Sequence, residues 1–238
     1  MTDLILVNAN VITMNPALPK GQLVAIKNGK IQSVGRNDSL KDLRNSKTEV
    51  IDCHGKTVLP GFIDTHIHFH GFVESLVILN LEPRNNVRSI SDIQDNIRDL
   101  SKELPPGTWI RGRGYNEFYL TEKRHPTRWD LDLATSTHPI KLTHRSGRAH
   151  VLNSLALKLV NISKETADPK DGLIDRVMET GDLTGLLYGM GDYLAKVIPP
   201  INIDHMEQGV ELANNELCSL GITSIHDTSP RNNLNRWE

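Results

Sequence analysis

The chain has 238 residues, of which 38% are hydrophobic and 24% charged, with a formal net charge of -2. This composition is typical of a globular protein of one large or two small domains. The near-zero charge excludes the strongly basic balance expected of a partner for nucleic acid or an anionic membrane.

The N-terminal sequence and the cysteine count indicate the cellular compartment of the protein. The opening MTDLILVNANVITMN has Asp3 where a secretory signal carries positive charge, and Asn8 and Asn10 interrupt its apolar run. No stretch approaches the roughly 20 apolar residues of a membrane span. Cys53 and Cys218 are too few for a disulfide framework, although one disulfide is open to them. We therefore expect a cytoplasmic protein.

Residues 1–58 read as strands joined by tight turns. Asn28-Gly29 lies between two short apolar runs, which predicts a two-residue hairpin, and His54-Gly55 predicts a second turn. The runs that these turns separate are 4–14, 23–26, 31–34, 50–52 and 56–59. We expect residues 1–58 to form a small antiparallel sheet or part of a β-sandwich.

The pattern from residue 59 onward predicts helices alternating with strands. Apolar residues spaced by three and four predict a helix over 90–104, capped by Ser89 or Ser91 and stopped by a Pro-Pro-Gly sequence. The other expected helices are 183–197 and 206–220, and the expected strands are 108–113, 139–143 and 222–226. Such alternation is typical of an α/β fold with a parallel sheet.

The segment that carries the chemistry is LPGFIDTHIH at 59–68. Alternate side chains of a strand share a face, so Asp64, His66 and His68 are expected to point one way. Three polar groups on one face of a buried strand cost free energy unless a ligand satisfies them, and a divalent metal does so. Imidazole nitrogens suit zinc, iron or nickel. By itself a His-x-His pair is a weak signal, and His70 is expected to be a loop residue rather than a ligand.

The motif at 59–68 resembles the first barrel strand of the amidohydrolase superfamily. Further stretches resemble its amidohydrolase-3 or YtcJ-like branch and follow the order of that branch along the chain. They are WIRGRGY at 109–115, PTRWDLD at 126–132, PIKL at 139–142, NSLAL at 153–157, DP at 168–169, TGLL at 184–187 and GITSIHD at 221–227.

This resemblance implies a fold and a reaction. The fold would be a small composite β-sandwich portion, residues 1–58, and the first part of a (β/α)8 TIM-like barrel, residues 59–238. Much of 70–220 would be an α/β insertion. The reaction would be hydrolysis of an amide or cyclic amide C–N bond in a small molecule, assisted by one or two divalent metal ions, with zinc favoured. His66 and His68 match the family's metal ligands, and Asp64 would orient a histidine.

The sequence departs from the family just before Asn153. A Gly-His pair is usual there, whereas this chain has Gly147-Arg148 with His150 two positions later. Arg145, Arg148 and His150 form either a solvated loop or a clamp for an anion, since arginine suits a carboxylate. His226 and Asp227 either bond nearby backbone or line the substrate pocket. The histidines read as surface or packing residues are His54, His125, His138, His144 and His205.

The remaining parts of the family's active site, including catalytic residues and a bridging lysine, match no residue here and are expected beyond Glu238. Residues 232–238 read as the opening of a helix. Three readings stay open: an N-terminal piece of a larger enzyme, inactive alone; half of a split enzyme completed by another chain; or a non-catalytic metal-binding or interaction module. Exposed faces would favour self-association.

Overall fold

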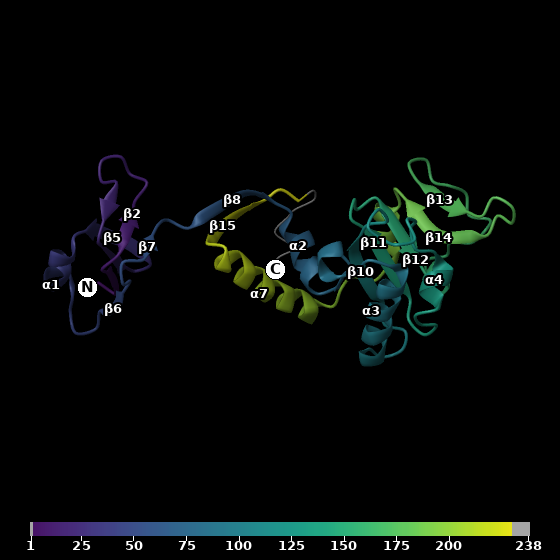
Figure 1. The fold of residues 1–238 in the computed structure, drawn as a ribbon, viewed down its shortest axis with the longest axis horizontal. Coiled ribbons are helices and arrows are strands. Elements are labelled where there is room, and N and C mark those ends of the chain that lie inside the picture. Colours follow the sequence, from purple (N-terminus) through teal and green to yellow (C-terminus); the bar gives the residue numbers. More distant parts are fainter. Residues whose placement is uncertain (1, 230–238) are drawn as a thin grey trace. The chain divides into compact units, whose positions relative to one another are not determined.

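The computed structural model describes residues 2–229, so the helix opening predicted at 232–238 lies outside the described residues. The chain divides into two compact units (Figure 1). Among the described residues, the first contains 2–65 and 218–226, and the second contains 66–217 and 227–229. Each unit is described separately.

Two small sheets form most of the first unit. The larger has the order β5-β4-β1-β6, with β1 (Leu4–Val7), β4 (Leu23–Lys27), β5 (Lys30–Gly35) and β6 (Glu49–Asp52). The smaller has the order β3-β2-β7, with β2 (Asn10–Ile12), β3 (Lys20–Gly21) and β7 (Thr57–Val58). A short helical segment follows β5, formed by η1 (Asn37–Ser39) and α1 (Leu40–Leu43).

Alternation along β4 explains the packing of this unit. Leu23 and Ala25 face one apolar cluster, against which leucines of α1 pack. Val24 faces a second cluster that also contains Val11 of β2 and Val58 of β7. The larger sheet therefore buries both faces, one of them against the smaller sheet. A two-residue hairpin joins β4 and β5 at Asn28-Gly29, as predicted, with positive φ at both positions.

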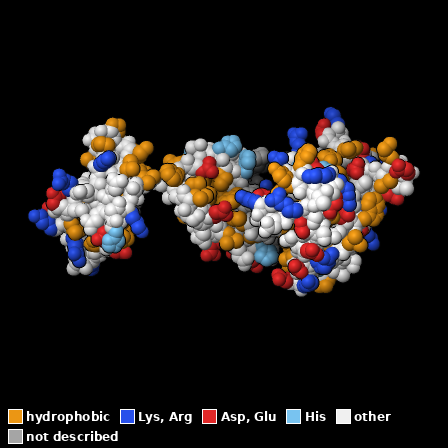
Figure 2. Space-filling view, viewed as in Figure 1, with side chains coloured by type: hydrophobic (Ala, Val, Ile, Leu, Met, Phe, Trp, Pro, Cys, Tyr) orange, Lys and Arg blue, Asp and Glu red, His pale blue; other side chains and the backbone are white. Residues whose placement is uncertain are grey.

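Strands β8 (Phe62–Ile67) and β15 (Ile222–Asp227) form a two-stranded sheet. The expected strand at 222–226 is thereby confirmed. The backbone N–H of Phe62 donates to the Gly221 carbonyl over 2.8 Å. Most residues of β8 and half of those of β15 are exposed, and Figure 2 shows hydrophobic side chains at the surface over this stretch.

A mixed six-stranded sheet organises the second unit, with the order β13-β14-β12-β11-β10-β9. Its strands are β9 (Leu79–Asn80), β10 (Ile110–Tyr115), β11 (Ile140–His144), β12 (Ala149–Leu152), β13 (Leu173–Arg176) and β14 (Leu183–Tyr188). Strands β9, β10 and β11 run parallel, whereas β11–β12, β12–β14 and β13–β14 pair antiparallel. The α/β class is confirmed, but the expectation of a parallel sheet holds for only half of this one.

Seven helical segments accompany this sheet among the described residues. They are α2 (Phe69–Leu76), η2 (Pro83–Asn85), α3 (Ile90–Glu103), α4 (Arg128–Asp132), α5 (Ser154–Leu159), α6 (Gly191–Val197) and α7 (Ile203–Ser219). Ser89 caps α3 in a capping box with Asp92, which confirms the first of the two predicted caps. Ile90, Ile93 and Ile97 form the buried face of this helix. None of the helices in 2–229 is both long and apolar enough to cross a membrane.

The single helix predicted over 183–197 is wrong. Residues Leu183–Tyr188 form β14, and only Gly191–Val197 are helical. The apolar run of β14 is buried between β12 and β13, and periodicity alone does not separate such a strand from a buried helix. Gly185, with φ +92°, and Gly189, with φ +66°, adopt conformations that a helix does not contain.

Candidate active site

His66 and His68 lie at the carboxyl end of β8 and share a face, as the alternation predicts. Their ring centroids are 5.5 Å apart and the rings meet edge to face. Both side chains are exposed, and histidines gather at the surface over this segment in Figure 2. Two accessible imidazoles at this spacing are suitable donors for a divalent cation.

The expectation that β8 is buried is wrong for the described residues. Its one neighbouring strand there is β15, and Phe62 and Ile63 expose 54% and 59% of their surface. Water can therefore reach the polar groups of this strand, and the burial argument for a metal does not apply. The metal inference rests instead on donor chemistry and spacing.

Asp227 follows β15 and adds a second observation near His68. Its Oδ1 accepts from the backbone N–H groups of Ser229, at 2.9 Å, and Phe69, at 3.3 Å. Its Oδ2 is buried and has no hydrogen-bond partner among the described residues. Desolvation raises the pKa of this carboxyl. The hydrogen bonds from Ser229 and Phe69 and the nearby charge of His68 lower it by a larger amount, so the net pKa lies below the usual value. A buried, ionised carboxylate oxygen without a partner fits a cationic neighbour.

These donors do not complete a metal site by themselves. Within residues 2–229, no group of three or more His, Cys, Asp or Glu side chains has the placement needed to hold a metal ion. Asp64 lies in β8 two residues before His66 and is half-buried, and His226 is exposed in β15. Among the described residues, the two imidazoles of His66 and His68 fit a divalent metal in their donor chemistry.

A cavity of about 650 Å³ lies in the second unit. Its polar wall is one face of the central sheet, where the side chains of Arg111 and Arg113 from β10 lie beside those of Lys141 and Thr143 from β11. His150 of β12 continues this face, because it pairs with Thr143. Helix α2 contributes His70 and Glu74, whose side chains approach to 3.6 Å. His70 was expected in a loop, but it belongs to this helix.

His150 is the most deeply buried of the predicted pocket residues. It exposes 4% of its surface, and its Nδ1 lies 3.2 Å from the Thr143 hydroxyl. Its Nε2 is buried without a hydrogen-bond partner among residues 2–229. Burial, and secondarily the charge of Lys141, lowers the pKa of His150 from 6.5 to about 4. The imidazole is therefore neutral near pH 7.

The structure separates the three residues proposed as an anion clamp. His150 is in a buried strand rather than a loop, whereas Arg145 and Arg148 are exposed in the turn between β11 and β12. Arg145 lines a different groove, together with Arg84, Arg88 and Arg113. Register places His150 opposite Thr143, and an anion clamp formed by Arg145, Arg148 and His150 together stays a prediction.

A second polar cluster contains two histidines that the sequence indicated only as packing residues. His144 Nε2 lies 2.8 Å from Glu117 Oε2, and the Tyr115 hydroxyl lies 3.0 Å from His125 Nδ1. Burial is the main cause that lowers the pKa of His125. The rings of Tyr115, His125 and His144 contact one another edge to face. No local motif marked this cluster, since its members come from separate segments.

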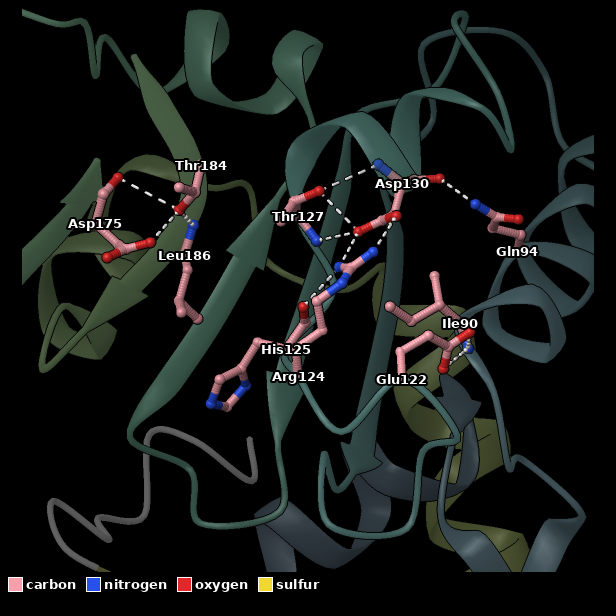
Figure 3. Close-up of polar contacts among 10 residues, drawn as sticks. All are labelled: Ile90, Gln94, Glu122, Arg124, His125, Thr127, Asp130, Asp175, Thr184 and Leu186. Atoms are coloured by element: carbon pink, nitrogen blue, oxygen red, sulfur yellow. Dashed lines mark hydrogen bonds and ion pairs between the residues drawn. The ribbon is translucent and has the colours of Figure 1, made fainter. Parts of the chain in front are cut away.

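The segment that holds His125 is anchored by a network shown in Figure 3. Arg124 donates to both carboxylate oxygens of Asp130 and to the His125 carbonyl. Asp130 also accepts from the backbone and hydroxyl of Thr127, which caps α4. These contacts fix the backbone next to His125, so its ring is held in place. His138 is also buried, and its Nδ1 bonds the Thr108 carbonyl, as expected for a packing residue.

Comparison with known proteins gives one consistent result. The model of the Amidohydrolase family matches residues 49–237. The N-substituted formamide deformylase of Arthrobacter pascens is 34% identical, over 95% of this chain and 42% of that protein. The putative amidohydrolase YtcJ of Bacillus subtilis (strain 168) is 29% identical, over 91% of this chain and 40% of that protein.

A solved structure agrees with these relatives. An uncharacterized metal-dependent hydrolase from Pyrococcus furiosus superposes with a TM-score of 0.68 and 26% identity, over 93% of this chain and 43% of that chain. The chain thus spans less than half the length of the proteins it matches.

Proposed function

Because the chain belongs to the amidohydrolase family, we propose that it is part of a metal-dependent hydrolase that cleaves non-peptide C–N bonds of small amides or cyclic amides. The observation that carries this proposal is the exposed pair His66 and His68 at the end of β8, whose rings lie 5.5 Å apart. The deformylase name of one relative and the metal-dependent hydrolase name of a structural neighbour support the same reaction class.

The residues of this chain would have distinct tasks. His66 and His68 would hold a divalent ion, with zinc favoured because imidazole suits it. A bound ion of this kind supplies Lewis acidity toward a substrate carbonyl. Asp227 fixes the backbone that follows His68, through its bond from the Phe69 N–H, and Asp64 would orient a ligand histidine. His226 remains a candidate for the wall of the substrate pocket.

We further propose that residues 1–238 alone have no appreciable activity. A catalytic zinc normally has three protein ligands, whereas residues 2–229 offer two histidines at this strand and no assignable general base. The open sheet formed by β8 and β15, with Phe62 and Ile63 exposed, favours self-association or a chain that supplies further strands. The split-enzyme reading and the non-catalytic module remain alternatives, and a cytoplasmic location remains a prediction.

Metal content tests the site directly. The parent chain, His66→Ala/His68→Ala and the control His54→Ala, whose side chain is 79% exposed, would be equilibrated with zinc, desalted and analysed for bound metal. We expect weak binding in the parent and control, and its loss in the double variant. Equal metal in all three would refute the site.

Activity assays test the other two statements. The zinc-loaded chain would be assayed against N-substituted formamides, N-acyl amino acids and cyclic amides, with light scattering on the same sample. We expect no turnover and some association. Turnover by a monodisperse monomer that disappears in His66→Ala would refute the inactivity of the chain while supporting the reaction class.

A further inference from the structure

The cavity in the second unit combines a cationic wall with an apolar one. Arg111 and Lys141 face each other as direct neighbours in the β10–β11 register. Like charges directly opposite in a sheet repel, so this placement needs an opposing charge. The lining of the cavity also contains Leu194 of α6, Ile198 directly after α6, and Met206 of α7. The cavity therefore suits a molecule with one charged end and one apolar end.

The described residues only partly compensate the charge on this wall. Glu74 is the carboxylate that acts on both Arg111 and Lys141. Burial and the nearby Arg111 lower the pKa of Lys141, and burial lowers the pKa of Arg111. None of the described residues gives the Lys141 ammonium a hydrogen bond or ion pair at contact distance. Arg111 also donates to the carbonyl oxygen of Pro199, which carries no net charge. Two partly buried cations thus face one carboxylate, which leaves one positive charge uncompensated.

His150 adds an unsatisfied polar atom to the same wall. Its Nε2 is buried and has no partner among the described residues, and the side chain lines the cavity. A Cβ at Gly191 would lie 3.3 Å from this atom, so the glycine leaves the ring edge uncrowded. The Thr143 hydroxyl can donate to Nδ1, which leaves the imidazole proton on Nε2. An acceptor in the cavity would satisfy that N–H.

We propose that this cavity binds a small organic acid whose carboxylate lies between Lys141, Arg111 and His150 Nε2 and whose apolar body packs on Leu194, Ile198 and Met206. A monoanion matches the single uncompensated charge, whereas a phosphate dianion exceeds it and repels Glu74. Arg113 also lines the cavity, but it is exposed and its charge is screened by solvent. The site depends on this cavity alone and not on hydrolysis.

Binding of matched probes tests the proposal. The probes are N-acetyl-L-leucine, its neutral primary amide and inorganic phosphate, titrated calorimetrically into the full chain after metal removal. The same titrations on His66→Ala/His68→Ala exclude binding through a residual metal. We expect the acid to bind both proteins equally and at least about tenfold more tightly than the amide, because hydrogen bonds to a charged carboxylate are stronger than those to a neutral amide. This outcome is independent of whether the chain hydrolyses anything.

Charge variants give effects of opposite sign. Lys141→Met should weaken binding of the acid about tenfold or more, whereas Glu74→Gln should tighten it, which general damage to the fold would not do. The matched control Lys158→Met removes an exposed lysine of α5 and should leave affinity unchanged. Equal affinity for acid and amide would overturn the proposal, as would unchanged affinity in Lys141→Met. Phosphate that binds more tightly than the acid would overturn the carboxylate assignment. If Lys141→Met does not fold, unchanged affinity in Glu74→Gln overturns the proposal.

Discussion

The neutral, buried state of His150 predicts a specific loss of stability in mild acid. The pKa of this imidazole is lowered from 6.5 to about 4 in the folded chain. Between these values the unfolded chain binds a proton that the folded chain does not, so the free energy of unfolding decreases as pH decreases. From pH 7 to pH 5 this single group should cost about 2 kcal/mol, and close to 3 kcal/mol by pH 4.

The assay is urea unfolding at pH 7 and pH 5, followed by tryptophan fluorescence, because Trp109 and Trp129 lie in the same unit as His150. His150→Asn keeps a hydrogen-bonding group near Thr143 but does not titrate. It should be less stable than the parent at pH 7 and should lose about 2 kcal/mol less than the parent between the two pH values. His205→Asn removes an exposed histidine from α7 and should behave as the parent does.

The test depends on the difference between the parent and His150→Asn, because other groups also titrate between pH 7 and pH 5. If the parent and His150→Asn lose the same stability between pH 7 and pH 5, His150 is not held neutral and the argument from its burial fails. A larger loss in His150→Asn would show that the imidazole is stabilised as a cation in the folded chain.

Two further substitutions test how the second unit is held together. Asn153→Ala should lower the free energy of unfolding by about 3 kcal/mol. The fully buried Asn153 side chain accepts from the N–H groups of Ile140, at the start of β11, and of Ala156, in the first turn of α5. Urea unfolding measures this loss, and a loss below about 1 kcal/mol would contradict the prediction. Gly185→Ala, at φ +92°, would place a Cβ 2.4 Å from the carbonyl oxygen of Leu152 in β12, so it should lower the melting temperature. The control Gly147→Ala, at φ +70° and with open space around the new Cβ, should lower it far less. Equal shifts in melting temperature would contradict the packing of β14.

Local signals in the sequence were sufficient where a few adjacent residues determine the conformation. Asn28-Gly29 forms its turn because both residues tolerate positive φ, and Ser89 begins α3 because it and Asp92 satisfy two backbone N–H groups. The spacing of His66 and His68 likewise fixed their common face. Each of these features depends on neighbours within four positions, so the chain does not need to be folded for them to be recognised.

The residues 183–197 show where local signals fail. Leu183, Leu186 and Leu187 have spacings that a helix face and a buried strand share. The choice is made by β12 and β13, which satisfy the backbone of β14 from both sides. Gly185 then permits a backbone conformation that a helix excludes. The deciding contacts are long-range, and composition within the segment does not contain them.

The cavity in the second unit depends both on local sequence patterns and on long-range contacts. Arg111 and Arg113 alternate along one strand, as do Lys141 and Thr143 along another, so the sequence alone indicates two strands that each have a polar face. Only the register, Arg111 opposite Lys141 and Thr143 opposite His150, brings these residues onto one surface. A one-residue shift of either strand would put its polar side chains against the opposite, apolar face, where Ile110, Ile140 and Leu142 are fully buried. Apolar packing on that face therefore fixes the register and holds two cations in direct opposition, and a bound carboxylate would relieve the repulsion between them.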